Sequence, residues 1–474
     1  MTKKRARKKF FIKKIIFFEN YLHFFLHISN IFRTFAHVDK QPSESKKVKK
    51  IIMTIMAAVA TMACMAQTGT WSGDLSVQGM KLQLVFRIGE SEGTIDSPAQ
   101  GARGIKLTVE RPTGDSIVMK IPTINGQYQG RLAGDEITGT FTQHGTTFPL
   151  TLKPGEKIAN RPQTPKPPYP YATEEVEFKN GDAILRGTLT LPEGCNRKTP
   201  VLLMVTGSGF QNRDEEILEH KPFAVIADAL ARHGIATLRY DDRGFGESKG
   251  NTATCTTEDL KNDAAAGIDL LRERFESVGV IGHSEGGTIG LMLASEGKTD
   301  FVVSLAGMVI SGKETLVWQN RTMLPYEGFS EAEVEAYCEI LGEAFDARVA
   351  GQNVPSIDNR DLPAMLKQDY KNTMLQLMYP YLRYFMTLDA RKFIGNITCP
   401  VLALNGTKDM QVEYKANLEA LRSGLPSAKT VAVEGLNHMF QHCQTGLTKE
   451  YQQIEETIAP EVLETIINWI RNER

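Results

Sequence analysis

Two G-x-S-x-G motifs in the chain could each carry a nucleophilic serine, Ser284 in residues 282–286 and Ser248 in residues 246–250. A serine hydroxyl attacks efficiently when a tight strand-to-helix turn holds it above a sheet and beside a base. Ser284 directly follows the apolar run VGVI and directly precedes TIGLMLASEG, which favours a helix, whereas the Thr-rich NTATCTT follows Ser248. We therefore expect Ser284 to be the nucleophile and Ser248 to have a role within its own loop.

A serine nucleophile needs a histidine base within hydrogen-bonding reach. His438 lies in GLNHMF, in the loop after the last predicted strand, TVAVEG, at the edge of the sheet where Ser284 is expected. His442 lies further along the chain, and the side chain of His283 is expected to point away across the turn. We predict that His438 is the base.

The acid that orients this histidine should follow a strand between the serine and the histidine. Asp409 comes three residues after the strand VLALNG, which ends at residue 406. Glu434 is too close to His438 along the chain to reach it comfortably, and Asp389 belongs to a predicted insertion. Asp409 is therefore the predicted third member of a catalytic triad.

An oxyanion hole requires two backbone amides that point at the developing negative charge. Glu285, which directly follows the nucleophile, is expected to supply one amide. The second is expected from the turn GSGF after the strand VLLMVT, where Ser208 is the first choice and Gly209 the next.

Alternating strand and helix patterns are expected to position these residues. Six apolar runs predict strands of a mostly parallel sheet buried on both faces: VLLMVTG (201–207), IATLRY (235–240), VGVIGH (278–283), FVVSLAG (301–307), PVLALNG (400–406) and TVAVEG (430–435). Helical patterns separate them, and residues 312–396 read as a helical cap insertion over the carboxyl edge of the sheet. This is the pattern of an α/β-hydrolase fold.

The rest of the chain divides into three further parts. Residues 68–155 contain short alternating runs separated by turn residues and predict a small all-β accessory domain, a sandwich or a barrel. Residues 156–173 form a linker with five prolines in RPQTPKPPYPY. The catalytic domain is expected to span residues 174–474, and residues 1–67 form a basic extension and signal peptide.

Several of these segments resemble one known family. TGSGFQNRDE (206–215), RYDDRGFGES (239–248), GHSEGG, GTKD and LNH look like motifs of the bacterial α/β-hydrolase carboxylesterases and their serine-aminopeptidase-like relatives. The resemblance implies a short-acyl carboxylesterase with Ser284, Asp409 and His438 as its triad. The family usually has His and Pro where this chain has Thr206 and Phe210. The β domain resembles an accessory domain attached to such hydrolases, for which no activity is implied.

The substrate preference is less constrained by the sequence. An aromatic-lined cleft would suit small acyl or aryl esters, although packing between helices accounts for most such side chains; the aromatic residues of the insertion are Trp318, Tyr326, Tyr379, Tyr381, Tyr384 and Phe385. A serine aminopeptidase or amidase is the alternative, and it needs carboxylates that pair with an ammonium group. The Glu-rich segment 330–345 could supply them, but it reads better as a capped, solvated helix. A non-catalytic binding protein with a vestigial hydrolase fold is the third hypothesis.

Composition limits the partners and cofactors. The net charge is −1 overall and +11 over residues 1–50, which leaves −12 on the rest, an acidic body unsuited to nucleic acid. There is no HExxH, Cys/His cluster or phosphate loop, so no metal or cofactor is expected. The expected partner is a small-molecule ester, and the oligomeric state stays open.

The basic N-terminal region reads as an export signal. Four lysines between residues 46 and 50 precede the apolar run IIMTIMAAVATMA, which is too short for a membrane span. Cleavage after Ala66 would release a periplasmic or extracellular enzyme, which we favour over a lipid anchor at Cys64. Because signals begin at the true N-terminus, translation starting at Val48 is one hypothesis. A basic amphipathic segment at a membrane is the other.

Overall fold

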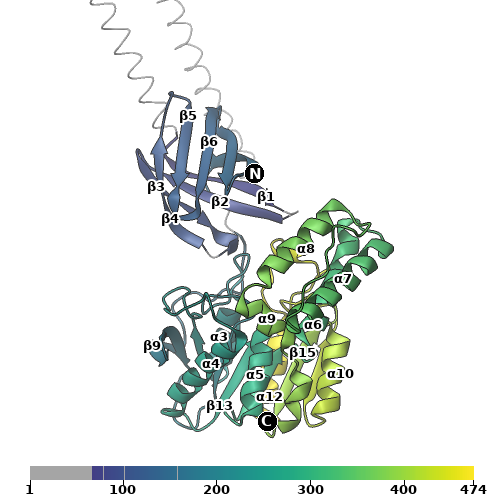
Figure 1. The fold of residues 1–474 in the computed structure, drawn as a ribbon. Helices are drawn as coiled ribbons and strands as arrows, with labels where there is room; N and C mark the ends of the chain where they lie inside the picture. Colours follow the sequence, from purple (N-terminus) through teal and green to yellow (C-terminus); the bar gives the residue numbers. More distant parts are fainter. Residues whose placement is uncertain (1–66, 78–79, 101, 157–158) are drawn as a thin grey trace, which may run out of the picture.

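The computed structural model describes residues 67–77, 80–100, 102–156 and 159–474. The predicted signal, the alternative start at Val48 and the cleavage sites lie outside these residues. Two bodies follow one another along the described chain, a β-barrel and then an α/β domain (Figure 1). Within the described residues, no helix is both long and apolar enough to cross a bilayer.

The first body is a closed barrel of eight antiparallel strands, each paired with the next, and β1 also pairs with β8. Leu84, Phe86 and Ile88 of the second strand point into the core while Arg87 is exposed, because side chains alternate along a strand. Of the two predicted architectures, sandwich and barrel, the barrel is the one formed. Its strands are β1 (Gly69–Val77), β2 (Met80–Ile88), β3 (Glu92–Ser97), β4 (Ala102–Glu110), β5 (Ser116–Ile121), β6 (Gly126–Ala133), β7 (Glu136–Gln143) and β8 (Thr146–Pro154).

The second body is built on an eight-stranded sheet in the order β16-β15-β14-β13-β11-β12-β10-β9. The six strands from β16 to β12 run parallel, and a β9–β10 hairpin joins them antiparallel to β12. The predicted fold class is confirmed, although the hairpin was not predicted. The strands are β9 (Ala172–Asn180), β10 (Ala183–Leu191), β11 (Val201–Val205), β12 (Ala236–Tyr240), β13 (Val278–His283), β14 (Phe301–Leu305), β15 (Val401–Gly406) and β16 (Lys429–Val433).

Helices cover both faces of this sheet. In β11, Leu202 and Met204 pack in one apolar cluster with helices α3 (Pro222–Arg232) and α12 (Pro460–Asn472). The alternate residues, Leu203 among them, pack on the other face with α4 (Thr257–Arg272) and α5 (Glu285–Ser295). Burial on both faces explains why these strands are continuous apolar runs.

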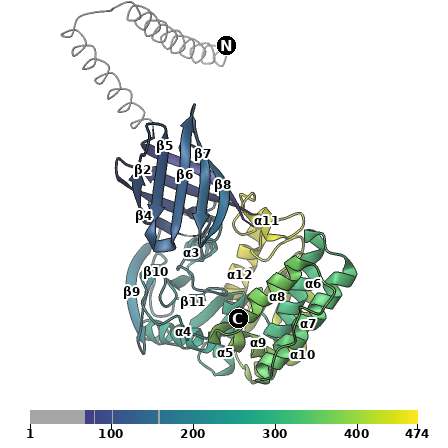
Figure 2. The ribbon, with the colours of Figure 1, turned by 45° about the horizontal axis from the view of Figure 1, so that its top comes forward.

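Four helices after β14 form a cap with an apolar cluster of its own. The cap stands beside the carboxyl edge of the sheet and extends toward the barrel (Figures 1 and 2). Its helices are α6 (Gly312–Met323), α7 (Glu331–Val349), α8 (Ala364–Gln376) and α9 (Pro380–Thr387).

The Pro-rich linker is bonded to the hydrolase domain. The Arg161 guanidinium donates to the carbonyls of Leu218, Gln452 and Ile454 at 2.9–3.0 Å. Gln163 Oε1 accepts from the amides of Thr457 and Ile458, while its Nε2 donates to the Ile458 carbonyl. The linker therefore lies against residues 452–458 and residue 218.

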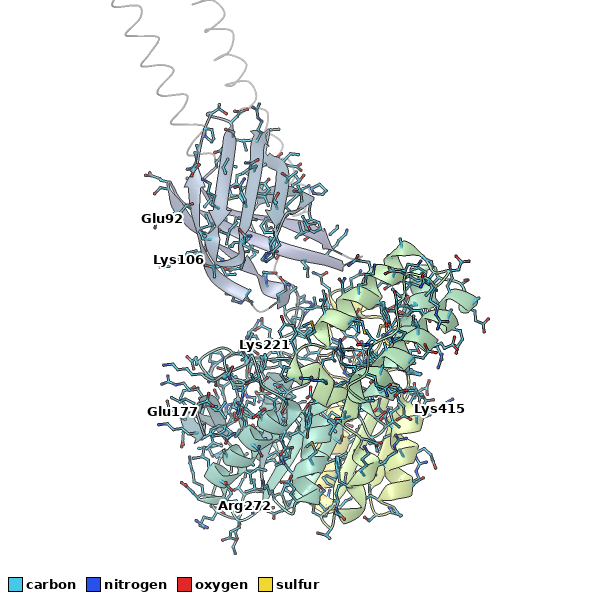
Figure 3. All side chains as sticks on the ribbon, viewed as in Figure 1. Glu92, Lys106, Glu177, Lys221, Arg272 and Lys415 are labelled. Atoms are coloured by element: carbon cyan, nitrogen blue, oxygen red, sulfur yellow. The ribbon has the colours of Figure 1, made fainter. Side chains whose placement is uncertain are left out.

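Charged side chains such as Glu177, Arg272 and Lys415 project outward from the surface of the hydrolase domain (Figure 3).

Candidate active site

Ser284 lies at a sharp turn between β13 and α5. Its backbone has φ 53° and ψ −120°, a positive-φ conformation that a residue other than glycine rarely adopts. Two glycines make the turn possible, because a Cβ on Gly282 would lie 2.0 Å from the Gly286 carbonyl oxygen. A Cβ on Gly286 would lie 2.1 Å from the Val205 carbonyl oxygen. The spacing of the G-x-S-x-G motif is thus a steric requirement of this turn.

The predicted acid and base form a buried pair. Asp409 Oδ2 lies 2.7 Å from His438 Nδ1, and both side chains are at most 5% exposed. Asp409 Oδ1 accepts from the amides of Gln411 and Val412, and Asn405 donates to Oδ2. Four donors therefore hold the carboxylate in one orientation, which directs the other imidazole nitrogen, Nε2, away from Asp409.

Ser284 and His438 line the same cavity, of about 310 Å³, between the sheet edge and the cap. Within the described residues, no hydrogen bond joins the Ser284 hydroxyl to His438. In enzymes without substrate such catalytic contacts are often long and tighten on binding. The structure therefore brings all three predicted triad residues together in one site, with the acid–base contact already formed.

Of the predicted oxyanion donors, Ser208 and Glu285 are the two with free amides. The neighbouring amides already donate hydrogen bonds within the protein. Gly207 donates to Glu215 Oε1 at 2.7 Å, and Gly209 donates to the Tyr381 hydroxyl at 3.1 Å. In the described chain, the amides of Ser208 and Glu285 donate to no protein acceptor. An amide without an acceptor beside the nucleophile is what an oxyanion hole requires. Gly209, the second choice for the turn, is not available as a donor.

The Glu285 side chain links the nucleophile turn to the cap. It is fully buried and accepts from Thr257 Oγ1 at 2.6 Å and from the Tyr381 hydroxyl of α9. Burial raises the pKa of this carboxyl, and the hydroxyl donors oppose that shift. Tyr381 thus bonds at once to the nucleophile helix and to the oxyanion turn.

The expectation that His283 points away from the site is wrong. Its ring lines the cavity, and its centroid lies 4.6 Å from that of His438. His283 Nε2 lies 2.9 Å from the His438 carbonyl oxygen, and Nδ1 lies 3.0 Å from Glu215 Oε1. Glu215 was not predicted, because it lies in a loop without periodicity; the only signal was its place in the motif TGSGFQNRDE.

The rival candidates lie in other environments. Ser248 is buried, and its hydroxyl donates to the Asp241 carbonyl and accepts from the Arg186 amide. His442 is exposed and contacts Glu456 and Glu461. The two rival acids, Asp389 and Glu434, do not line the cavity. Asp389 pairs with Arg391, and Glu434 is exposed.

Two of the six aromatic residues named in the cap, Tyr381 and Phe385, line the cavity. The Glu-rich segment forms α7, and the expected cap is a capping box in which Ser330 and Glu333 bond to each other's backbone amides. None of its glutamates lines the cavity.

In the described chain, no group of three or more His, Cys, Asp or Glu residues is placed to hold a metal ion.

A serine at a strand–helix turn, an Asp–His pair at neighbouring strand ends and a helical cap over a mostly parallel sheet define an α/β-hydrolase. Comparison with known proteins agrees. Residues 219–442 match the family model described as Serine aminopeptidase, S33. The second domain therefore has an α/β-hydrolase fold and is similar to hydrolases of the carboxylesterase and serine-aminopeptidase type, as its motifs predicted.

Individual relatives are more distant. Esterase EstD of Thermotoga maritima is 26% identical over 321 residues, which cover 66% of this chain and 72% of that esterase. Among solved structures, Est1E from Butyrivibrio proteoclasticus with bound ferulic acid is 18% identical. The match covers 63% of this chain and 98% of Est1E, with a TM-score of 0.39. Esterase Pf2001 of Pyrococcus furiosus is 15% identical, over 64% of this chain and 92% of its own, with a TM-score of 0.38.

Proposed function

We propose that the protein is an exported serine carboxylesterase that cleaves short-chain acyl or aryl esters through an acyl-enzyme on Ser284. The observation that carries this proposal is the buried Asp409–His438 pair on the wall of the cavity that also contains Ser284. The resemblance to Esterase EstD supports ester hydrolysis as the reaction class.

In the proposed reaction, His438 Nε2 takes the proton of the Ser284 hydroxyl as the oxygen bonds to the ester carbonyl carbon. The amides of Ser208 and Glu285 stabilise the resulting oxyanion. The oxyanion collapses, the bond to the alcohol oxygen breaks, and His438 returns its proton to the leaving alcohol. Water then releases the acid by the same steps, with His438 again as base, and Asp409 holds the imidazole in the required tautomer.

The cavity supports a small substrate. Its volume of about 310 Å³ is at the lower end of the range for small-molecule sites. The part formed by the cap and neighbouring loops is largely apolar, beside Gln319 and Gln411, and suits an acyl or aryl group; its apolar members are Met308, Leu316, Leu382, Phe385, Val412 and Met439.

Export remains part of the proposal. The lysines and the short apolar run before residue 66 support a cleaved signal, with a periplasmic or extracellular product. N-terminal sequencing of protein collected outside the cytoplasm tests it: a mature end near residue 67 supports release, and an acylated Cys64 supports an anchor. An intact residue 1 in the cytoplasm would contradict export.

The catalytic proposal is tested with p-nitrophenyl acyl esters, acetylated sugars and aminoacyl arylamides, on wild type and Ser284→Ala. We expect wild type to cleave the nitrophenyl esters and to react with a fluorophosphonate, and Ser284→Ala to do neither. Cleavage of the arylamides alone would favour an aminopeptidase. Equal labelling of both proteins, or none, would favour a non-catalytic binding protein.

A further inference from the structure

One buried carboxylate, that of Glu215, bonds to both halves of the site. Its Oε1 accepts from the Gly207 amide at 2.7 Å, directly before the oxyanion donor Ser208. The same oxygen lies 3.0 Å from His283 Nδ1. The Glu215 side chain is 4% exposed, so these contacts are shielded from water.

His283 carries the connection to the catalytic base. Its Nε2 lies 2.9 Å from the backbone carbonyl oxygen of His438. Because a carbonyl oxygen only accepts, Nε2 carries a proton and donates a hydrogen bond to it. With Nε2 protonated, a bond from Nδ1 to an ionised Glu215 requires a proton on both nitrogens. Glu215, His283 and the His438 backbone thus form a continuous chain of hydrogen bonds.

The electrostatics of the pair favour this charged form. Burial lowers the pKa of His283, but the charge and hydrogen bond of Glu215 outweigh burial, so the pKa lies above its ordinary value. Within the described chain, Glu215 Oε2 is buried without a hydrogen-bond partner. An ionised carboxylate buried in this way is costly unless a cation lies beside it. The imidazolium of His283 is that cation.

The segment that carries Glu215 is held from several sides. Glu215 has φ +50°, and Asn212 Oδ1 accepts from the amides of its two neighbours, Asp214 and Glu216. The Leu218 amide donates to the Ala99 carbonyl of the barrel at 3.2 Å. Lys221, at the junction of the two domains in Figure 3, lies 3.5 Å from Asp214. The segment is therefore a fixed support for the carboxylate.

We propose that Glu215 and His283 are positioning residues that hold the oxyanion turn and the catalytic histidine loop in fixed relation to each other. The proposal rests on the proposed function of Ser284 and His438. Neither residue of the pair reacts with the substrate. The pair acts on catalysis through Gly207 on one side and through the His438 backbone on the other.

The pair also places a positive charge beside the catalytic imidazole. The titratable groups that face His283 are Glu215, His438 and Asp409. Glu215→Gln keeps an acceptor for Gly207 but removes the charge that keeps His283 protonated. Without that nearby cation His438 takes up a proton more readily, so the acid limb of the rate profile moves to higher pH. We expect a shift of about 1 pH unit, because a charge within about 4–6 Å moves a pKa by roughly 1–3 units and loss of the more distant Glu215 charge offsets part of that effect.

The test measures the rate of Ser284 labelling by a fluorophosphonate between pH 5 and 9, together with kcat and KM for p-nitrophenyl acetate. For Glu215→Gln we expect kcat to fall about tenfold, KM to change less than about twofold and the acid limb to shift upward. Glu215→Ala and His283→Phe lose the hydrogen bonds as well, so we expect falls of about 100-fold, the effect of a misplaced catalytic group.

Glu216→Gln is the matched control, since this neighbouring carboxylate contacts Arg103 and Lys221 and neither Gly207 nor His283. We expect it to match wild type in rate and pH profile. Because the larger substitutions could unfold the chain, Glu215→Gln with a Tm near that of wild type is the deciding variant. If the fluorophosphonate labels wild type, and Glu215→Gln has an unchanged kcat and an unshifted pH profile, the positioning proposal is overturned and the proposed function stands. A wild type that does not label overturns the proposed function and this inference together.

Discussion

The two domains bury polar groups differently. The barrel encloses an almost wholly apolar core in which the Tyr128 hydroxyl donates to the carbonyls of Ile137 and Leu150. Its buried charge, Asp96, bonds to the Gly104 amide and pairs with the partly exposed Arg87. The hydrolase domain instead buries several ionisable groups near one edge of its sheet: Glu215, Asp242, His283, Glu285, Asp409 and His438.

This difference indicates where the molecule does chemistry. A buried ionisable group costs stability unless other groups bond to it, so such groups are expected where they are used. At the hydrolase edge five of the six contact another member of the site or the oxyanion turn, and Asp242 accepts from Thr206 and Gln211, which flank that turn. The barrel has no comparable set among its described residues. The predictions below test this contrast through activity, from the largest expected effect to the smallest.

Asp409→Asn should have the largest effect. The amide can still accept from the backbone, but it cannot accept from His438 Nδ1–H without a flip and cannot stabilise an imidazolium. We expect kcat for nitrophenyl esters to fall about 10⁴-fold, the order seen when a triad aspartate is replaced. Asp389→Asn, a change of the same kind in the cap, should leave kcat within about twofold. Equal losses in the two variants would show that Asp409 has no special role.

Tyr381→Phe should have an intermediate effect. It removes the acceptor of the Gly209 amide and one of the two hydroxyl donors to the buried Glu285 carboxyl. The two lost hydrogen bonds are each worth about 0.5–1.5 kcal/mol, and a loss of about 1.4 kcal/mol of this at the oxyanion turn lowers kcat about tenfold. Tyr384→Phe is the control, because its hydroxyl bonds to Glu258, away from that turn. Hydrolysis of nitrophenyl esters gives kcat for both variants. Equal kcat values would show that the Tyr381 hydroxyl does not support the oxyanion turn.

The sequence was sufficient to predict that the proposed triad residues meet, because parallel strands place their carboxyl ends along one edge. Ser284, Asp409 and His438 each follow a recognisable apolar strand, so strand ends alone predicted that they meet. The β9–β10 hairpin was missed because β9 is mostly exposed and its sequence, ATEEVEFKN, has few apolar residues. A local pattern cannot show that such a segment pairs with a sheet edge.

The parts of the site that could not be predicted depend on contacts between loops. Glu215 adopts a positive φ without being glycine, and no periodicity places its carboxylate under Gly207. His283 follows the strand alternation until the turn, where the bond to His438 determines its direction. The choice between Ser208 and Gly209 depends on Tyr381, which is 172 residues distant in the chain. Only tertiary structure contains that information.

Asp242→Asn should affect stability against pH more than activity. Burial raises the pKa of Asp242 to about 8, although Thr206 and Gln211 donate to it. A raised pKa in the folded state means that the protonated form favours folding. The neutral Asp242 carboxyl contributes its full stabilisation below about pH 4, the pKa of aspartate in the unfolded chain. That contribution is lost as the pH rises through 8.

The asparagine variant keeps the acceptor and cannot ionise, so its Tm should fall less than that of wild type between pH 5 and 8. Its kcat/KM at pH 7 should stay within about twofold of wild type. Asp346→Asn, at an exposed carboxylate, should follow the wild-type curve. Parallel Tm curves for all three proteins would contradict a neutral, buried Asp242.

Tyr128→Phe, inside the barrel, should have the smallest effect on activity. The change removes a hydroxyl that donates at 2.9 and 3.2 Å to two carbonyls in a fully buried core. We expect the free energy of unfolding to fall by about 1–2 kcal/mol, since buried hydrogen bonds are lost without a large cavity. The kcat/KM should not change, because the folded barrel still presents the Ala99 carbonyl to Leu218. Tyr326→Phe, at a tyrosine 55% exposed on the cap, is the control for loss of a hydroxyl. A fall in kcat/KM under conditions where the variant is fully folded would mean that the barrel core and the catalytic edge are coupled, and the contrast between the domains would then fail.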